Sequence, residues 1–292
     1  MTGWRRREFL GVAVALAAPL SARGAALDLG ALETRHGGRI GIAAHDLTSG
    51  RKVGWRAGER FAYCSTFKLF LAAAVLQRVA AGKERLDRQV PVTAADIVSH
   101  APVTGPMVGK TMSVEALCEA MVDVSDNPAA NIMIRQIGGL DAWRGWYRSI
   151  GDKLTTVDRF EPALNSAKPG DPRDTTTPVQ AAANVAKVLA GDLLTPAHRA
   201  LLTRWAVATP TGPGRIKAGV PAGSIVAHKT GTADPGPTND IGLVWLPDGR
   251  VIAVAAYFTE SNAPTQADRD AVIAEATRAA IATLGRASGG QG

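Results

Sequence analysis

Ser65 and Lys68 stand three residues apart at the start of an apolar, Ala-rich run, residues 65–81, that has no internal Gly or Pro. This texture predicts a buried helix, on which both side chains lie on one face. A lysine that loses hydration has a lowered pKa and can accept the proton of a serine hydroxyl. The helix N-terminus also favours negative charge on that oxygen. The pair therefore indicates nucleophilic catalysis by serine, although the same spacing recurs at Ser49 and Lys52 in a polar turn.

Three further segments bring polar side chains to the junctions of expected elements. They are Ser125-Asp126-Asn127 between two expected helices, Lys229-Thr230-Gly231 at the end of an expected strand, and Glu161 with Asn165 in the Pro- and Asp-rich residues 159–174. A serine between helices, a lysine on a strand and a carboxylate in a loop can converge only through the tertiary fold. Together they offer a nucleophile, proton carriers and a base that can activate water.

In this order and spacing, the four elements resemble those of the class A enzymes in the penicillin-binding and serine β-lactamase superfamily. The resemblance covers essentially all of the mature chain, and residues 159–174 match the omega loop of class A. It implies hydrolysis of the β-lactam ring of penicillins and cephalosporins through a serine acyl-enzyme. Such an activity confers β-lactam resistance.

The resemblance also implies a role for each matching residue. Ser65 is the nucleophile, and Ser125 passes a proton to the lactam nitrogen as the ring opens. Glu161 and Asn165 hold the hydrolytic water, while the base for acylation stays open between Lys68 and Glu161. The backbone N–H groups of Ser65 and Thr232 form the oxyanion hole. The other substrate-binding residues are Asn127, which binds the side-chain amide, and Lys229, Thr230, Gly231 and Thr232 on the carboxylate side.

One role must be assigned between two positions, and two other positions depart from common family patterns. Relatives place an arginine beside the substrate carboxylate at one of two places, where this chain has Thr238 and Arg215. We therefore assign that role to Arg215, whose guanidinium can bind a carboxylate through two parallel hydrogen bonds. His100 replaces a Tyr or Trp gate and keeps a flat ring at that position. His228 replaces an acidic residue before the lysine of the third motif.

Strand-like sequences gather at both ends of the mature chain and helical sequences in its middle. The expected strands are residues 39–46, 52–56, 224–232, 241–246 and 250–258, and the expected helices include 27–37, 65–81, 113–124, 127–137, 178–189 and 266–284. We predict an α/β (α+β) fold in which an antiparallel sheet, flanked by terminal helices, is formed by residues 27–60 and 212–292. An all-helical domain, residues 61–211, is inserted, and the active site lies in the cleft between the two.

Residues 1–26 have the pattern of an export signal. A basic segment, Arg5-Arg6-Arg7, precedes an apolar run at residues 9–20. That run is too short for a membrane-spanning helix, which needs about 20 residues. The segment resembles a twin-arginine signal. We therefore expect a periplasmic or secreted protein with no stable membrane anchor after the signal is removed.

The composition limits the remaining partners. The 292 residues are 46% hydrophobic and 20% charged, which suits a folded core and excludes wholesale disorder. The net charge of +7 comes from dispersed basic residues without interleaved aromatics, which argues against nucleic acid. The five His are scattered and no Cys/His cluster has ligand spacing, so we expect neither a metal nor another cofactor. The expected partners are a small-molecule β-lactam and the hydrolytic water, bound by a monomer.

Two contacts can be predicted from the resemblance. Arg159 and Asp174, at the two ends of the omega loop, should form an ion pair that fixes the loop. Cys64 and Cys118 should be free thiols, because relatives that bridge the Cys118 position have a cysteine where this chain has Ala72.

Two alternative functions belong to the same superfamily. A DD-peptidase would lack the deacylation pair, which Glu161 and Asn165 supply here. A β-lactam sensor domain would stay acylated and would need a membrane-spanning region and a second module, which the sequence does not show.

Overall fold

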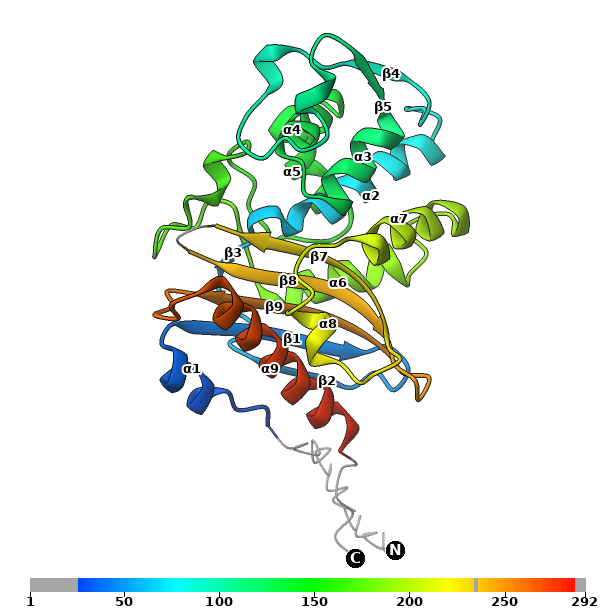
Figure 1. The fold of residues 1–292 in the computed structure, drawn as a ribbon. Helices are drawn as coiled ribbons and strands as arrows, with labels where there is room; N and C mark the ends of the chain where they lie inside the picture. Colours follow the sequence, from blue (N-terminus) through cyan, green and yellow to red (C-terminus); the bar gives the residue numbers. More distant parts are fainter. Residues whose placement is uncertain (1–25, 234–235, 287–292) are drawn as a thin grey trace, which may run out of the picture.

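A five-stranded antiparallel sheet joins the two ends of the chain (Figure 1). The structure, a computed structural model, describes residues 26–233 and 236–286, so the predicted export signal lies outside the described residues apart from Ala26. The strand order is β2-β1-β9-β8-β7. The bounds are β1 Arg39–Asp46, β2 Lys52–Trp55, β7 Ile225–Thr232, β8 Thr238–Trp245 and β9 Val251–Thr259. The N-terminal hairpin therefore pairs with the last strand, and β7 forms one edge.

Strand β8 begins earlier than the expected residues 241–246. Its first residue, Thr238, pairs with Thr232 of β7. The polar residues that open β8 do not look like strand residues, but they are buried and have partners. Asn239 donates to the carbonyl oxygen of Ala62 at 2.9 Å, and Asp240 contacts His228 on β7. Hydrogen bonds from neighbouring segments thus hold a polar sequence in a buried strand.

Helices cover both faces of the sheet. The C-terminal helix α9 (Gln266–Gly285) lies in front of the sheet in Figure 1, with α1 (Gly30–His36) and α8 (Ile216–Gly219) beside it. Helix α6 (Pro178–Leu189) packs on the opposite face against β1, β8 and β9. Successive side chains of β1 point to opposite faces of the sheet, so this strand contributes to the core on each face. Ile40 and Ile42 belong to the core under α9, whereas Ala43 belongs to the core on the other face.

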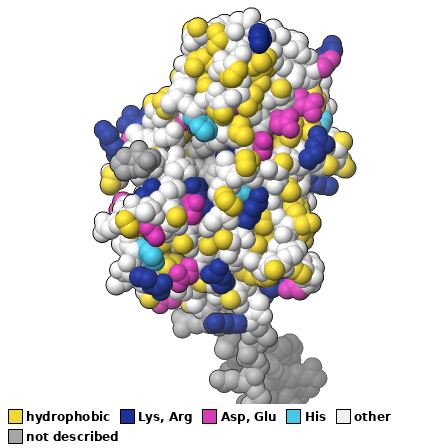
Figure 2. All heavy atoms as spheres, in the orientation of Figure 1, with side chains coloured by type: hydrophobic (Ala, Val, Ile, Leu, Met, Phe, Trp, Pro, Cys, Tyr) yellow, Lys and Arg dark blue, Asp and Glu magenta, His cyan; other side chains and the backbone are white. Residues whose placement is uncertain are grey.

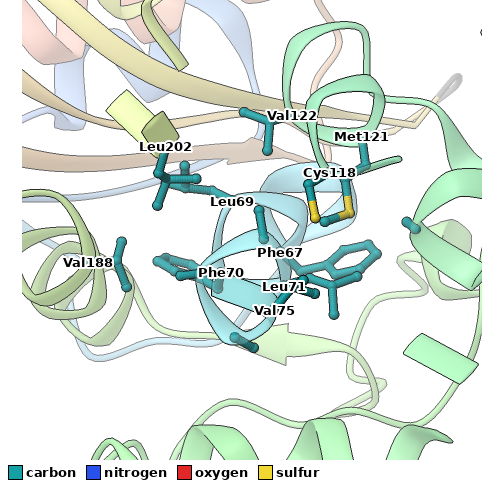
Figure 3. Packing of buried hydrophobic residues seen from close by; sticks show 14 of the residues in the cluster. Phe67, Leu69, Phe70, Leu71, Val75, Cys118, Met121, Val122, Val188 and Leu202 are labelled. Atoms are coloured by element: carbon teal, nitrogen blue, oxygen red, sulfur yellow. The ribbon is translucent and has the colours of Figure 1, made fainter. Parts of the chain in front are cut away.

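The middle of the chain forms the helical part above the sheet. Its longer helices are α2 Phe67–Ala80, α3 Val114–Asp123, α4 Asn127–Gln136, α5 Gly139–Ser149 and α7 Pro196–Ala208, with 3₁₀ turns at Cys64–Thr66, Ala94–Asp96, Gly105–Met107 and Ala163–Ser166. Helix α2 is the central element because its residues from Phe67 to Leu76 are all buried. A helix that is apolar on all sides must be surrounded by others, as Figure 3 shows.

The inserted part is not all helical, contrary to the sequence-based expectation. It contains two short two-stranded sheets, formed by β3 (Phe61–Ala62) with β6 (Thr175–Thr176) and by β4 (Gln89–Pro91) with β5 (Thr111–Ser113). Strands of two or three residues are too short to leave a period-two pattern in the sequence. The predicted mixed α/β fold with an antiparallel sheet is confirmed.

One hydrophobic core connects the helical part with the sheet. It includes α2, α3 and α5 residues together with Ala227, Ile241 and Tyr257 of the sheet. Cys118 points into this core beside α2 (Figure 3), and both Cys64 and Cys118 are buried free thiols, as predicted. Burial raises the pKa of both thiols.

Two surface properties bear on the expected partners. None of the helices in the described part of the chain is both long and apolar enough to cross a membrane. On the face shown in Figure 2, acidic and basic side chains are interspersed, without a broad patch of one sign.

Candidate active site

Ser65 lies in the 3₁₀ turn that leads into α2, and its hydroxyl has two ionisable neighbours. Lys68 Nζ donates to Ser65 Oγ at 2.8 Å, and Ser65 Oγ donates to Glu161 Oε1 at 3.2 Å. Lys68 Nζ and Glu161 Oε1 are 3.0 Å apart, and both side chains are fully buried. Burial lowers the pKa of Lys68, and the Glu161 carboxylate opposes that shift. The serine hydroxyl is thus placed between two groups that can exchange its proton.

Hydrogen bonds from its own loop and from α4 fix the position of Glu161. Asn165 Nδ2 donates to Glu161 Oε2 at 2.5 Å. Asn131 of α4 clamps the Glu161 backbone from both sides: its Nδ2 donates to the carbonyl oxygen and its Oδ1 accepts from the amide, each at 2.9 Å. The Glu161–Pro162 peptide bond is cis. Sequence reasoning missed Asn131, because a lone asparagine inside a helical pattern gives no signal of its contacts.

The loop before α4 places Ser125 and Asn127 on the opposite side of Lys68. Lys68 Nζ donates to the carbonyl oxygen of Ser125 at 2.8 Å, to Ser125 Oγ at 3.3 Å, and to Asn127 Oδ1. Asp126 caps α4 by accepting from the amide of Ala129, and Ser125 has a positive φ of 62°. The cap and the left-handed residue turn both flanking side chains towards Lys68.

His100 lies at the rim of the site. Its carbonyl oxygen accepts from the amide of Asn127 at 3.0 Å, and its ring Nε2 contacts the carbonyl oxygen of Val124 at 2.9 Å. The side chain is exposed, and its backbone has a positive φ of 60°. One ring nitrogen is therefore held by the backbone, and His100 contributes to the lining of the active-site cavity.

Strand β7 forms the other wall, and Gly231 allows it to approach Ser65. A Cβ at Gly231 would lie 2.7 Å from the carbonyl oxygen of Tyr63 and 3.1 Å from the amide of Thr66. Only glycine fits this contact, which brings Thr232 next to the turn that carries Ser65.

Lys229 and Thr230 complete the β7 wall. Lys229 is fully buried, donates to the carbonyl oxygen of Thr230 at 3.0 Å, and burial lowers its pKa well below the ordinary value. The hydroxyl of Thr230 contacts that of Thr211 at 2.8 Å. Thr211 is a further lining residue that the sequence analysis did not select.

Arg215 is nearly buried, and most of its donors are committed to the protein. Nε donates to Asp270 Oδ1 at 2.7 Å, and one terminal nitrogen donates to the carbonyl oxygens of Gly231 and Asn239 at 3.2 and 2.8 Å. The other terminal nitrogen donates to Thr232 Oγ1 at 2.8 Å. Four of five N–H groups are thus used within the described residues. This leaves one, so the expected pair of parallel bonds to a carboxylate does not fit this geometry.

His228 takes part in a buried pair behind the β7 wall. Its Nδ1 lies 2.9 Å from Asp240 Oδ2, and both side chains are fully buried. Asp240 Oδ2 also accepts from the amide of Ile216 at 3.2 Å. His228 therefore connects β7, β8 and the start of α8, just behind Arg215.

The predicted ion pair of the omega loop is confirmed. Arg159 Nε lies 2.5 Å from Asp174 Oδ2, and the Asp174 side chain is fully buried. Asp174 Oδ1 also accepts from the amides of Asp158 and Arg159 and from the hydroxyl of Tyr63. One carboxylate thus fixes both ends of the loop that carries Glu161.

These residues surround a cavity of about 270 Å³ at the junction of the helical part and the sheet. Its lining consists of Ser65, His100, Ser125, Asn127, Asn165, Thr211, Gly212, Arg215, Thr230 and Thr232. The predicted residues Lys68, Glu161, Lys229 and Gly231 lie behind this lining. Among the residues that the structure describes, no group of three or more His, Cys, Asp or Glu could hold a metal ion. The arrangement can support acyl transfer to serine followed by attack of water.

Comparison with known proteins assigns the chain to a family. A family model described as "Beta-lactamase enzyme family" matches residues 25–284. The β-lactamase FAR-1 of Nocardia farcinica is 41% identical over 260 residues, covering 89% of this chain and 83% of that protein. The β-lactamase L2 of Stenotrophomonas maltophilia is 41% identical over 300 residues, covering 96% and 99%.

Solved structures agree with the sequence relatives. An ancestral class A β-lactamase is 50% identical to this chain and superposes with a TM-score of 0.84, covering 87% of this chain and 97% of that one. The matching family model, the sequence relatives and the shared fold define the class of protein as a hydrolase of β-lactams. The chain belongs to the class A β-lactamase family, and hydrolysis of the β-lactam ring is its activity.

Proposed function

We propose that Ser65 opens the β-lactam ring of penicillins and cephalosporins and that Glu161 drives hydrolysis of the resulting ester. The observation that carries this proposal is the position of Ser65 Oγ, 2.8 Å from Lys68 Nζ and 3.2 Å from Glu161 Oε1. Both partner side chains are fully buried, so a base and a cation are held in place beside the serine hydroxyl.

In acylation, Ser65 Oγ bonds to the lactam carbonyl carbon, and the carbon–nitrogen bond of the ring breaks. The hydroxyl proton can pass to Glu161 directly or to Lys68 in its neutral form, whose population burial increases. The leaving nitrogen needs a proton, and Ser125 Oγ lies 3.3 Å from Lys68 Nζ. Lys68 therefore connects the proton released at Ser65 with the proton delivered by Ser125.

In deacylation, a water molecule attacks the ester carbonyl, and its proton passes to Glu161. Asn165 contacts Glu161 Oε2 at 2.5 Å and lines the cavity, so it can share that water. The ester bond to Ser65 Oγ breaks, and the serine oxygen regains a proton. Backbone N–H groups of Ser65 and Thr232 hold the oxyanion in both steps, which the close approach allowed by Gly231 supports.

The remaining lining residues orient the substrate. Asn127 would bind the side-chain amide, and Thr230, Thr232, Lys229 and Gly231 shape the carboxylate side of the β7 wall. Arg215 contributes one free N–H and holds the Thr232 hydroxyl. His100 lies at the rim as a flat ring over the opening.

Glu161→Gln tests the mechanism, because it keeps the shape of the side chain and removes the base. Ser65 should still be acylated, since Lys68 remains in contact with its hydroxyl. The adduct should persist, because no carboxylate is left to activate water. Intact-mass spectrometry after mixing with a penicillin should show the protein plus one ring-opened drug long after the wild type has cleared it.

A matched control is Glu119→Gln, an exposed carboxylate on α3 outside the cavity lining. It should turn over like the wild type. Turnover of Glu161→Gln at the wild-type rate would refute the role of this loop, and a wild-type enzyme that stays acylated would favour the sensor or DD-peptidase alternative.

The remaining expectations stay with this proposal. The protein would act as a monomer on a small-molecule substrate, after export to the periplasm or medium by the twin-arginine route and loss of residues 1–26. Residues 27–60 with 212–292 would form one unit and residues 61–211 the other, although α6 packs on the sheet and the two parts share a core.

A further inference from the structure

A second cavity lies on the opposite side of the sheet from α9, between the β1–β2 hairpin and α6. It measures about 310 Å³, and most of its lining is apolar, including Ala43, Ala57, Val179 and Ala183. None of its lining residues lines the active-site cavity. A cavity of roughly 150 Å³ is enough to bind benzene, so this one has room for an apolar body of about ten heavy atoms.

Val179 lines this cavity and has an exposed apolar side chain. It lies in the first turn of α6 and is 45% exposed, which is unusual among the large hydrophobic side chains of this protein. Its backbone amide donates to the carbonyl oxygen of Ala57 at 3.0 Å, so the α6 wall is fixed against the loop after β2. The cavity is therefore bounded by anchored backbone.

Two basic side chains stand at the polar end of the cavity. His45 of β1 and Lys52 of β2 are direct partners in the antiparallel ladder, so their side chains lie on the same face of the sheet. Both line the cavity. Within the described residues, neither side chain forms a hydrogen bond or an ion pair with an acidic group.

The adjacent acidic residue does not neutralise this pair. Asp46 points to the other face of β1, where its Oδ1 accepts from the amides of Thr48 and Ser49. Burial lowers the pKa of His45 and the Lys52 ammonium adds to that effect, while the Asp46 carboxylate opposes it only in part. At neutral pH the lowered pKa keeps His45 neutral, so Lys52 carries the positive charge of this pair and the His45 imidazole offers an N–H donor beside it.

We propose that this cavity binds a small amphiphilic monocarboxylate, with its apolar body along Ala43, Ala183 and Val179 and its carboxylate at Lys52 and His45. Lys52 supplies the charge, and an imidazole N–H of His45 supplies a second hydrogen bond. The apolar lining excludes a purely inorganic anion as the preferred ligand, and the basic pair disfavours a cation. The volume favours a single short chain or a small aromatic body.

The test is a titration of the mature enzyme with octanoate, followed site by site through amide ¹H–¹⁵N chemical shifts. Octanoate should shift the amides of Gly54 and Ala183 in a saturable way. Octan-1-ol carries the tail without the charge and should bind about fivefold more weakly, the upper end for one lost, partly exposed charge contact. Acetate carries the charge without the tail and should bind much more weakly still, because it buries almost no apolar surface. Equal binding of either control would overturn the proposal. Shifts confined to active-site amides such as Thr232 would also overturn it.

Three variants and one control separate the two ends of the ligand. Lys52→Gln should weaken octanoate about fivefold and leave octan-1-ol unchanged, whereas Lys83→Gln, at an exposed lysine after α2, should change neither. Ala183→Leu should fill the cavity and abolish both. Val179→Gln, at an exposed position that tolerates a polar side chain, should weaken both ligands even where Ala183→Leu fails to fold. Unchanged octanoate affinity in Lys52→Gln or Val179→Gln would refute the assignment.

Discussion

On the hydrolytic side of the active-site cavity, formed by Ser65, Lys68, Glu161 and Asn165, two opposite charges are buried in contact. On the recognition side, formed by Thr230, Thr232 and Arg215, the guanidinium of Arg215 is divided among Asp270, two carbonyl oxygens and a hydroxyl. The first side depends on one ion pair without solvent. The second also contains an ion pair, Arg215 with Asp270, but the Arg215 guanidinium is shared with three neutral acceptors.

This difference predicts different consequences of substitution. A buried ion pair gains little net stability, but removing one partner leaves a charge that nothing compensates. In a network of several hydrogen bonds, one substitution removes only part of the contacts, so each substitution costs less stability. Changes on the hydrolytic side should therefore alter both stability and chemistry, and changes on the recognition side should mainly alter substrate binding.

The largest effect is expected for Lys68→Met, which keeps the volume and removes the ammonium. Glu161 would remain as a fully buried carboxylate without its cation. The free energy of unfolding should fall by about 3–5 kcal/mol, measured by urea denaturation, and acylation should slow severely. The double variant Lys68→Met/Glu161→Gln removes both charges and should recover most of this stability. A single variant as stable as the wild type would contradict the comparison.

Asp174→Asn should have the next largest effect, because Asp174 joins the omega loop to the hydrolytic side. Its carboxylate is fully buried and pairs with Arg159. Loss of the charge should cost about 3 kcal/mol of stability. Deacylation should slow more than acylation, because Glu161 lies in this loop whereas Ser65 does not.

The control for Asp174→Asn is Asp141→Asn, whose carboxylate also pairs with an arginine but is 93% exposed. This variant should match the wild type in urea denaturation and in pre-steady-state acylation and deacylation rates. Equal destabilisation by the two variants would show that burial does not decide the effect.

The sequence predicts the site well where one short segment carries the information. Ser65 with Lys68, the Lys229-Thr230-Gly231 element and the Arg159–Asp174 pair are found where the motifs predict them. The clamp of Asn131 on Glu161 is different, because it depends on two segments that meet only after folding. The sequence does not predict the two-residue strands β3 and β6 for the same reason. Their pairing with each other makes them strands, and their composition gives no signal.

Arg215 shows a second limit of sequence reasoning. Its position in the sequence predicts a guanidinium near the β7 wall. It does not show how many N–H groups of that guanidinium bind other groups of the protein. The carbonyl oxygens of Gly231 and Asn239 and the Thr232 hydroxyl are available only because β7 and β8 pair at this point.

Arg215→Ala should therefore weaken the recognition side without unfolding the enzyme. We expect transition-state stabilisation, calculated from the ratio of wild-type to variant kcat/KM, to fall by about 1.5–3 kcal/mol, the range for a hydrogen bond to a charged group. If Arg215 acts mainly by orienting Thr232, Thr232→Val should give a similar loss, and the double variant should lose little more than either single one. Fully additive losses would show that Arg215 contacts the substrate independently, as the sequence-based assignment has it.

The smallest effect, and one of opposite sign, is expected for Lys229→Met. Lys229 is as deeply buried as Lys68, but within the described residues it has a carbonyl oxygen rather than a carboxylate as its partner. Burial holds its pKa well below the ordinary value, with Lys68 as a second cause. At neutral pH, burial of the Lys229 amine therefore lowers the free energy of unfolding. A methionine at this position would not have that destabilising effect. The free energy of unfolding should rise by about 1 kcal/mol in this variant, while activity falls because the carboxylate side loses its cation.

The pH dependence of this gain provides a sharper test. Between the lowered pKa of Lys229 in the folded state and about 10.4 in the unfolded chain, the unfolded state binds more protons. Wild-type stability therefore gains a contribution that increases with pH across that window, and Lys229→Met lacks it. Lys68 shifts in the same direction, but it is present in both proteins, so its direct contribution cancels in the difference. Urea denaturation at a series of pH values should show the advantage of Lys229→Met shrinking as the pH rises towards 10. The idea would be contradicted by a stability advantage that stays constant with pH, or by a variant less stable than the wild type at neutral pH. Either result would show that the surroundings of Lys229 stabilise its charge as well as Glu161 stabilises that of Lys68.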